Sequence, residues 1–268
     1  MEKDTRRRRR PAYLDHPGPL PLAHRGFSLD GLENSMAAFG AAVALGYRYV
    51  ETDVHATRDG VLVAFHDETL DRVTDRLGRI PELSWREVSR ARILGSNEGV
   101  PRLEDLLEAW PDLRVNIDVK SRSAILPLAR VIERARAHDR VCVTSFSDQR
   151  RRAAVMRLSK PVTTSAGQGT VTRFRAAAEL PPLVRPAVVA RVLAGVDGLQ
   201  VPVRHSGVEV VTAATVAAAH EVGAYVHVWT INEVAEMERL LDMGVDGIVS
   251  DRADLLKGVL EARGQWFQ

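Results

Sequence analysis

Short β-branched runs alternate with longer stretches of helical period along most of this chain of 268 residues. This alternation is typical of repeated βα units around a parallel sheet. A single barrel domain of eight such units has about this length, so we expect an α/β protein with a TIM (β/α)8 barrel over residues 19–268. The strand candidates are 20–24, 48–55, 61–66, 115–119, 141–145, 161–164, 198–202, 224–229 and 247–250.

The candidate 61–66 is one strand more than a closed eight-stranded barrel needs. It follows Asp59-Gly60, a dipeptide that favours a two-residue hairpin turn when apolar runs flank it. We therefore predict that 61–66 returns antiparallel along the second strand. Counting outward from a two-residue turn pairs Asp53 with His66 on the same face of the hairpin.

The helices are marked mainly by their ends. Asn34 is a candidate N-cap before a helix over Ser35–Leu45, and Gly46 is suited to end it. Further helical segments are expected at 124–137, 147–158, 209–222, 233–243 and 252–262. Residues 67–102 do not follow the βα pattern and contain several glycines, so we expect a small capping insertion over the barrel mouth.

The composition, 45% hydrophobic and 27% charged, is that of an ordinary globular protein. No apolar run is long enough to span a bilayer, which predicts no stable membrane insertion. The basic run Arg6–Arg10 is not followed by the apolar stretch of a secretory signal. Cys142 is the only cysteine, so an internal disulfide and a thiolate zinc site are excluded. A cytoplasmic location fits these features.

The positive charge is concentrated at the start of the chain. Residues 1–10 carry six cations against Glu2 and Asp4, a net of +4, whereas the whole chain has a formal charge of +2 and the rest therefore −2. The basic run lacks interleaved aromatic residues, so we expect a disordered basic tail over residues 1–18 and no nucleic-acid partner. The sequence does not indicate an oligomeric state.

Candidate chemistry begins at His24-Arg25-Gly26, directly after the first predicted strand. Barrel enzymes carry their catalytic groups at the carboxyl ends of the strands. A histidine can exchange a proton near neutral pH, and an arginine can hold two phosphate oxygens at once. Taken alone, the tripeptide is better explained as a structural turn.

Acidic residues on two predicted strands suggest a cation site. Glu51 and Asp53 are two residues apart and share one face of their strand, and Asp118 and Lys120 turn inward together on the next one. Buried carboxylates need a cation or basic neighbours to offset their charge. A salt-bridged pair is the alternative, but three carboxylates suit a hard divalent cation such as Mg²⁺ or Ca²⁺.

The predicted hairpin places His66 beside these carboxylates. With His24 it makes two imidazoles near one cationic centre, an arrangement in which one can remove a proton from a nucleophile and the other can protonate a leaving alkoxide. The alternative is that His66-Asp67 only caps a turn. His55 lies on the same side if alternation persists, where it could contact substrate at the periphery.

The chain resembles the glycerophosphodiester phosphodiesterase family, within the superfamily of phospholipase-C-like phosphodiesterases. The resemblance runs through most of the chain in order and spacing. The matching motifs are His24-Arg25-Gly26, Glu33-Asn34-Ser35 with Ala38-Phe39, Glu51-Thr52-Asp53-Val54, Thr57 with Asp59-Gly60, His66-Asp67, Asn116 to Lys120, Ser145-Phe146 and Val228-Trp229-Thr230.

The resemblance implies an enzyme, a phosphoric diester hydrolase that splits glycerophosphodiesters into glycerol 3-phosphate and an alcohol. It implies that His24 and His66 are the general acid–base pair, and that Glu51, Asp53 and Asp118 hold the divalent metal. It also implies that Arg25 and Lys120 contact phosphoryl oxygens and that Trp229 forms a wall against glycerol. The family usually has Glu where this chain has Asp118, a shorter ligand that leaves the identity of the metal open.

Two other functions remain open from the sequence. One is lysophospholipase D-type hydrolysis, which needs an apolar channel for an acyl chain. The other is a non-catalytic phosphate-binding barrel, which would not need a second histidine. Among the remaining residues, Gln200 could face the barrel interior, whereas His16, His138, His205 and His220 are expected at the surface or at helix ends.

Overall fold

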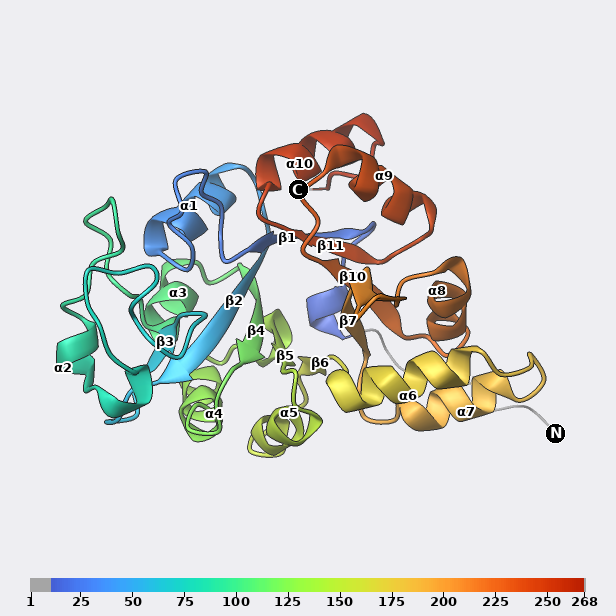
Figure 1. Cartoon of the computed structure of the whole chain (residues 1–268), viewed down its shortest axis with the longest axis horizontal. Helices are drawn as coiled ribbons and strands as arrows, with labels where there is room; N and C mark the ends of the chain where they lie inside the picture. Colours follow the sequence, from blue (N-terminus) through green and yellow to red (C-terminus); the bar gives the residue numbers. More distant parts are fainter. Residues whose placement is uncertain (1–10, 268) are drawn as a thin grey trace.

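The computed structural model describes residues 11–267 and contains one main sheet of parallel strands. The order is β6-β5-β4-β2-β1-β11-β10-β7, and a parallel bridge between Ser165 and Gly198 joins the two ends. The result is the predicted TIM barrel with its ring of helices (Figure 1). The strands are β1 (Leu20–His24), β2 (Tyr49–Ala56), β4 (Arg114–Val119), β5 (Val141–Thr144), β6 (Thr163–Thr164), β7 (Gly198–Pro202), β10 (Tyr225–Trp229) and β11 (Gly247–Ser250).

Helices follow most of the strands and pack apolar faces against them. They are α1 (Met36–Ala44), α2 (Trp85–Val88), α3 (Leu103–Ala109), α4 (Ile125–Arg134), α5 (Asp148–Val155), α6 (Gln168–Ala178), α7 (Arg185–Val192), α8 (Ala213–His220), α9 (Val234–Asp242) and α10 (Ala253–Ala262). The sequence did not predict α3, α6 or α7. The predicted N-cap of α1 is also corrected, because the Ser35 side chain, not that of Asn34, accepts the hydrogen bond from the Ala38 N–H.

The strand after β2 returns antiparallel as predicted, but its register is shifted by one residue. β3 (Leu62–Ala64) pairs Val54 with Ala64, and the Phe65 N–H donates to the Asp53 carbonyl at 2.9 Å. The predicted pairing of Asp53 with His66 is therefore wrong. The Thr57 N–H instead bonds to Val61 O at 2.9 Å across a three-residue loop, in which Gly60 has φ +82°. A type I turn followed by a left-handed glycine is the usual form of such a loop.

The insertion between β3 and α3 has a small core of its own. It contains the short helices η2 (Ile80–Glu82) and α2, linked by irregular segments and isolated bridges. Its apolar side chains pack on β3 and the residue that follows it; the buried members are Val63, Phe65, Leu70, Ile80, Val88, Ala91 and Val100. This segment matches the loop-rich insertion expected over residues 67–102.

A short segment before β1 seals one end of the barrel interior. The 3-10 helix η1 (Ala12–Leu14) buries Tyr13 completely, and the Tyr49 hydroxyl donates to the Tyr13 carbonyl at 2.9 Å. The predicted disordered tail of residues 1–18 is thus wrong for residues 11–18, while residues 1–10 with the Arg6–Arg10 run lie outside the described residues. Burial of Tyr13 adds this segment to the barrel domain because it supplies core packing.

Two further short elements complete the described chain. The hairpin β8 (Arg204–His205) and β9 (Val208–Glu209) projects after β7, and η3 (His138–Arg140) precedes β5. No helix within residues 11–267 is long and apolar enough to cross a membrane.

Candidate active site

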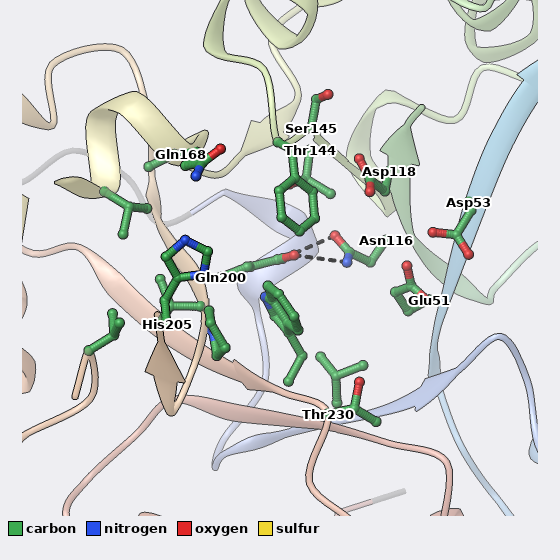
Figure 2. Close-up of a pocket in the computed structure, with 18 of the residues that line it drawn as sticks. Glu51, Asp53, Asn116, Asp118, Thr144, Ser145, Gln168, Gln200, His205 and Thr230 are labelled. Carbon is green, nitrogen blue, oxygen red and sulfur yellow. Dashed lines mark hydrogen bonds between the residues drawn. The ribbon is translucent and has the colours of Figure 1, made fainter. Parts of the chain in front are cut away.

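The three predicted metal carboxylates lie on neighbouring parallel strands. Asp53 of β2 is in register with Asp118 of β4, and Glu51 is in register with Asn116. Because equivalent positions of paired strands point the same way, all four side chains face one cavity of about 450 Å³. Figure 2 shows them gathered at one side of this cavity, with Gln168 and His205 at the other.

Two basic side chains neutralise Asp53. Lys120 Nζ is 2.8 Å from Asp53 Oδ1 and 2.8 Å from Asp118 Oδ2, and Arg25 Nε is 3.1 Å from Asp53 Oδ2. Burial alone would raise the pKa of Asp53, but Lys120 and Arg25 outweigh it and hold the pKa below its ordinary value. The same two carboxylates raise the pKa of Lys120 against the effect of its burial. Lys120 therefore stays charged.

The other two carboxylates are less well compensated. Burial, together with the neighbouring Asp53, raises the pKa of Glu51 to about 8. Burial also raises the pKa of Asp118, whose Oδ1 has no hydrogen-bond partner among the described residues. An unpaired buried carboxylate oxygen costs free energy until a cation or donor reaches it.

These carboxylates fit a hard divalent cation in their chemistry. They supply only oxygen ligands, which Mg²⁺ and Ca²⁺ prefer, and the charges of Glu51 and Asp118 are only partly compensated by His24 and Lys120. Lys120 separates Asp53 from Asp118, and within residues 11–267 no three acidic, histidine or cysteine side chains converge closely enough to form a metal cluster. The shared cation site of Glu51, Asp53 and Asp118 remains a prediction.

His24 stands at the end of β1 between two carboxylates. Its Nδ1 is 2.6 Å from Asp251 Oδ1, and its Nε2 is 3.7 Å from Glu51 Oε2. Burial would lower the pKa of His24, but the hydrogen bond to Asp251 and the charge of Glu51 outweigh it, so the pKa is raised. Since a carboxylate only accepts, Nδ1 carries the proton and Nε2 faces Glu51.

Asp251 is itself held in place by Asn232. Asn232 Nδ2 donates to Asp251 Oδ2 at 2.8 Å, and the Asp251 backbone N–H donates to Asn232 Oδ1 at 3.0 Å. The sequence reasoning did not identify either residue. The available signal was position, because Asp251 immediately follows the last barrel strand, where barrels place functional groups.

His66 enters the same cavity from the residues after β3. Strict alternation from Phe65 would turn it away from Asp53, but the strand ends at Ala64 and the chain bends before His66. Its Nδ1 is 2.6 Å from Asp67 Oδ1. His66 therefore lines the same cavity as the three carboxylates, although it is not paired with Asp53 as predicted.

A chain of ion pairs ties His66 to the β1 side of the site. Arg72 of the insertion donates from Nε to Asp67 Oδ2 at 2.6 Å, and its NH2 group lies 2.7 Å from Glu33 Oε1. Arg25 NH1 donates to the same Glu33 oxygen at 2.9 Å. Arg72 was not singled out from the sequence, since a surface arginine in an irregular segment has no local pattern that marks it.

Asn34 serves the site rather than the helix. Its Nδ2 donates to Asp53 Oδ2 at 3.3 Å, and its Oδ1 accepts from the Thr52 hydroxyl at 2.7 Å. The residue has φ +56°, a left-handed conformation that asparagine adopts more readily than most residues. This explains why Asn34 is not the N-cap.

The far side of the cavity is largely apolar. Trp229 lies at the end of β10 as predicted, with its ring centroid 5.7 Å from that of Phe146. Phe146 in turn lies 5.7 Å from Lys120 Nζ. Further apolar lining comes from α6, β7 and the β8–β9 region: Val171, Val201, Pro202, Val208 and Val210.

The other polar residues considered from the sequence are Gln200 and five further histidines. Gln200 faces the interior and exchanges two hydrogen bonds with Asn116, at 2.9 and 3.0 Å (Figure 2). His205 is exposed, as expected, and also lines the cavity. His138 begins η3 and His220 ends α8, as expected for helix ends, although His138 is buried; His16 is buried, contrary to expectation. His55 is buried, with its Nε2 3.1 Å from the His66 carbonyl, outside the cavity lining.

Comparison with known proteins gives consistent relatives. A model of the "Glycerophosphoryl diester phosphodiesterase family" matches residues 24–255. The chain is 49% identical over 255 residues to "Probable glycerophosphodiester phosphodiesterase 2" of Mycobacterium tuberculosis, and the match covers 95% of each chain.

Solved structures share the fold at lower identity. A putative glycerophosphoryl diester phosphodiesterase from Silicibacter pomeroyi superposes with a TM-score of 0.78 at 22% identity, covering 96% of this chain and 100% of that one. An Oleispira antarctica phosphodiesterase, solved in complex with the product sn-glycerol-3-phosphate, has a TM-score of 0.73 at 21% identity and covers 91% and 97%.

Proposed function

The chain belongs to the glycerophosphoryl diester phosphodiesterase family, and from that premise we propose that it hydrolyses glycerophosphodiesters to glycerol 3-phosphate and an alcohol with the help of a divalent cation. One observation carries this proposal. Two histidines, each hydrogen-bonded to its own carboxylate, line a cavity that also contains three further carboxylates, a lysine and two arginines. Proton transfer and neutralisation of a phosphodiester are the tasks that such a set of groups performs together.

Arg25 and Lys120 hold the phosphoryl oxygens. Lys120 has three donors, two of which contact Asp53 and Asp118, so one remains for substrate. Arg25 is fixed by Glu33 at NH1 and by Asp53 at Nε, and its remaining N–H groups can meet a second oxygen. Trp229 and Phe146 bound the space for the glycerol or head-group carbons.

The two histidines move the protons. One accepts a proton from water, or from the adjacent glycerol hydroxyl, as that oxygen forms its bond to phosphorus. If the glycerol hydroxyl attacks, the product is a cyclic phosphate, and water then attacks phosphorus in a second step that breaks the ring P–O bond and gives glycerol 3-phosphate. The other donates a proton to the alkoxide of the alcohol as its P–O bond breaks, so that a neutral alcohol leaves. Asp251 and Asp67 keep the ring of each histidine oriented by accepting from Nδ1. The roles of acid and base are left open between His24 and His66.

The cation belongs with Glu51, Asp53 and Asp118. When bound there, Mg²⁺ or Ca²⁺ would supply positive charge for a phosphoryl oxygen in the transition state. The fit rests on the buried Asp118 Oδ1 and on the raised pKa of Glu51. Asp118 is a shorter ligand than the glutamate usual in the family, so the preferred cation is a property to be measured.

Product analysis tests the reaction. We expect equimolar glycerol 3-phosphate and choline from glycerophosphocholine in the presence of Mg²⁺ or Ca²⁺, and strongly reduced release by the His66→Ala variant. Glycerol with phosphocholine would contradict the cleaved bond. No turnover of any glycerophosphodiester with either cation would favour a phosphate-binding barrel instead.

A second candidate is lysophospholipase D-type hydrolysis, which the apolar side of the cavity favours. Val171, Val201 and Val208 extend the lining away from the carboxylates, and an acyl chain would gain free energy by contact with them. The same assay with lysophosphatidylcholine below its micellar concentration discriminates the two. A higher kcat/KM for the lysophospholipid than for glycerophosphocholine would favour this candidate.

A further inference from the structure

A second cavity lies outside the barrel, between α5 and the hairpin formed by α6 and α7, which pack side by side along the lower edge in Figure 1. It has a volume of about 290 Å³ and shares no lining residue with the active-site cavity. Its lining combines basic and apolar side chains and consists of Arg151, Arg152, Thr170, Arg173, Val188, Arg191, Val192, Ala194 and Val196. No carboxylate is among these described residues.

Arg151 is the buried member of the set, with 4% of its surface exposed. Its NH1 lies at the long distances of 3.4 Å from the Thr164 hydroxyl and 3.3 Å from the Gly195 carbonyl. Within residues 11–267 its Nε has no hydrogen-bond partner. Burial lowers the pKa of this guanidinium because it has lost hydration. A buried charge with an unused donor is costly unless an anion meets it.

The acids nearest to Arg151 are already engaged. Asp148 accepts from the backbone N–H groups of Gly167 at 3.0 Å and Thr170 at 2.9 Å, and it remains 3.9 Å from Arg151 NH2. Asp197 accepts from the Thr164 N–H at 2.9 Å. Neither acid lines the cavity, so the guanidinium groups there are not neutralised from inside it.

The three other arginines stand at the exposed rim. Arg173 lies in the middle of α6, and its side chain reaches back to the first turn, where Nε donates to the Gly169 carbonyl at 3.1 Å and NH2 donates to the Thr170 hydroxyl at 3.1 Å. In the described part of the chain, Arg152, Arg173 and Arg191 form no ion pair with a carboxylate within 4.0 Å. Like charges on three helices repel one another, and an anion bound between them would reduce this repulsion.

We propose that Arg151, Arg152, Arg173 and Arg191 form an anion site, separate from the active site, that binds a small phosphorylated molecule. Guanidinium groups donate in pairs to phosphate oxygens, which suits them to such a ligand better than to an uncharged organic molecule. The valines and Ala194 in the same lining can contact the carbon part of an organic phosphate. An inorganic phosphate ion is the simplest ligand of this class, and an organic phosphate would in addition contact the apolar residues.

The test is a calorimetric titration of the metal-free full chain with pyrophosphate. The Arg152→Ala/Arg191→Ala double variant removes two exposed arginines of the cavity and leaves the buried Arg151 in place. Its matched control is Arg130→Ala/Arg157→Ala, which removes the same charge from exposed positions outside the cavity. We expect about tenfold or greater loss of affinity in the first pair and little change in the control, with unchanged turnover of glycerophosphocholine in both.

Equal pyrophosphate affinity in the wild type and both double variants would overturn the site, since binding would then lie at the active site or be unspecific. Absence of any saturable binding to the wild type at millimolar pyrophosphate would overturn it as well. Melting temperatures without ligand check that the double variants are folded. In the wild type, affinity should also fall steeply with rising salt concentration, as expected for an exposed basic site.

Discussion

Replacement of Asp251 by asparagine should move the proton of neutral His24 from Nδ1 to Nε2 without disturbing the fold. Asn232 Nδ2 donates to one side-chain oxygen of Asp251, so the amide oxygen of an introduced asparagine is drawn to that side. The new NH₂ group then faces His24 Nδ1, which must accept instead of donate. The neutral imidazole consequently carries its proton on Nε2, the nitrogen that faces the cavity.

The expected effect on rate is large and specific. General acid–base catalysis contributes about 10²–10⁴ in rate, and the wrong tautomer removes the contribution of one histidine. We therefore predict that kcat falls about a hundredfold, a barrier increase of about 2.7 kcal/mol, while KM changes little because Asp251 does not line the substrate cavity. The variant should melt close to the wild type, since the Asp251 side chain is half-exposed.

The assay is steady-state hydrolysis of glycerophosphocholine over a range of pH, with Asp112→Asn as a control in an exposed loop before β4. Loss of the Asp251 charge should also lower the pKa of His24, which this carboxylate helps to raise. A kcat for Asp251→Asn within about twofold of the wild type, well below the usual contribution of a catalytic proton transfer, would refute the role of Asp251 in orienting His24.

Three further predictions concern His66, the first described segment and the insertion. His66→Ala should reduce turnover about a hundredfold with little change in melting temperature, because the side chain is 35% exposed; normal turnover would remove His66 from the mechanism. Tyr13→Ala should lower the free energy of unfolding, measured with denaturant, by about 3–5 kcal/mol. Tyr13→Phe should not lower it, since the buried hydroxyl has no hydrogen-bond partner among the described residues. An alanine variant as stable as the wild type would show that Tyr13 is not part of the core. Arg72→Ala should reduce the free energy of unfolding above pH 4 but not near pH 2. The hydrogen bond from Arg72 lowers the pKa of Asp67 from 3.8 to about 2, so the stabilisation by this ion pair is lost as the pH falls through that range. A difference in unfolding free energy between wild type and variant that is constant with pH would contradict this.

The barrel strands could be predicted from the sequence because their residues alternate or are uniformly apolar over short runs. Each of the eight predicted parallel strands has a counterpart in the sheet, within a few residues. α6 and α7 could not be predicted because their exposed faces carry scattered polar and small residues with little helical periodicity. The predicted end of the disordered tail at residue 18 was wrong because only the packing of the barrel shows that Tyr13 is a core residue.

The hairpin register shows how little separates two solutions in sequence. Asp59-Gly60 suits a two-residue turn and also the end of a three-residue loop. Thr57 decides between them, because its hydroxyl donates to Asp59 Oδ1 at 2.6 Å and accepts from the Val61 N–H at 3.0 Å. These side-chain hydrogen bonds stabilise the longer loop and were not visible as a pattern.

The candidate site could be predicted in part because its acids obey strand alternation. Glu51, Asp53 and Asp118 follow the period of two and face the cavity together. Asp251 and Asn232 come from the opposite end of the chain and reach His24 only through closure of the barrel. A contact between residues so far apart in the chain cannot be predicted from the residues around either one.

The most direct test of the proposed chemistry is a titration of the metal-depleted enzyme with Mg²⁺ while glycerol 3-phosphate release from glycerophosphocholine is followed. We predict negligible turnover in chelator, saturable recovery with added cation, and a shift of the midpoint to about tenfold or higher concentration in Asp118→Asn, because a neutral amide is a poorer ligand than a carboxylate. Calcium is titrated in parallel, since the donor set suits either ion. Full turnover in chelator, or the same midpoint for the wild type and Asp118→Asn with both cations, would contradict a cation held by Glu51, Asp53 and Asp118.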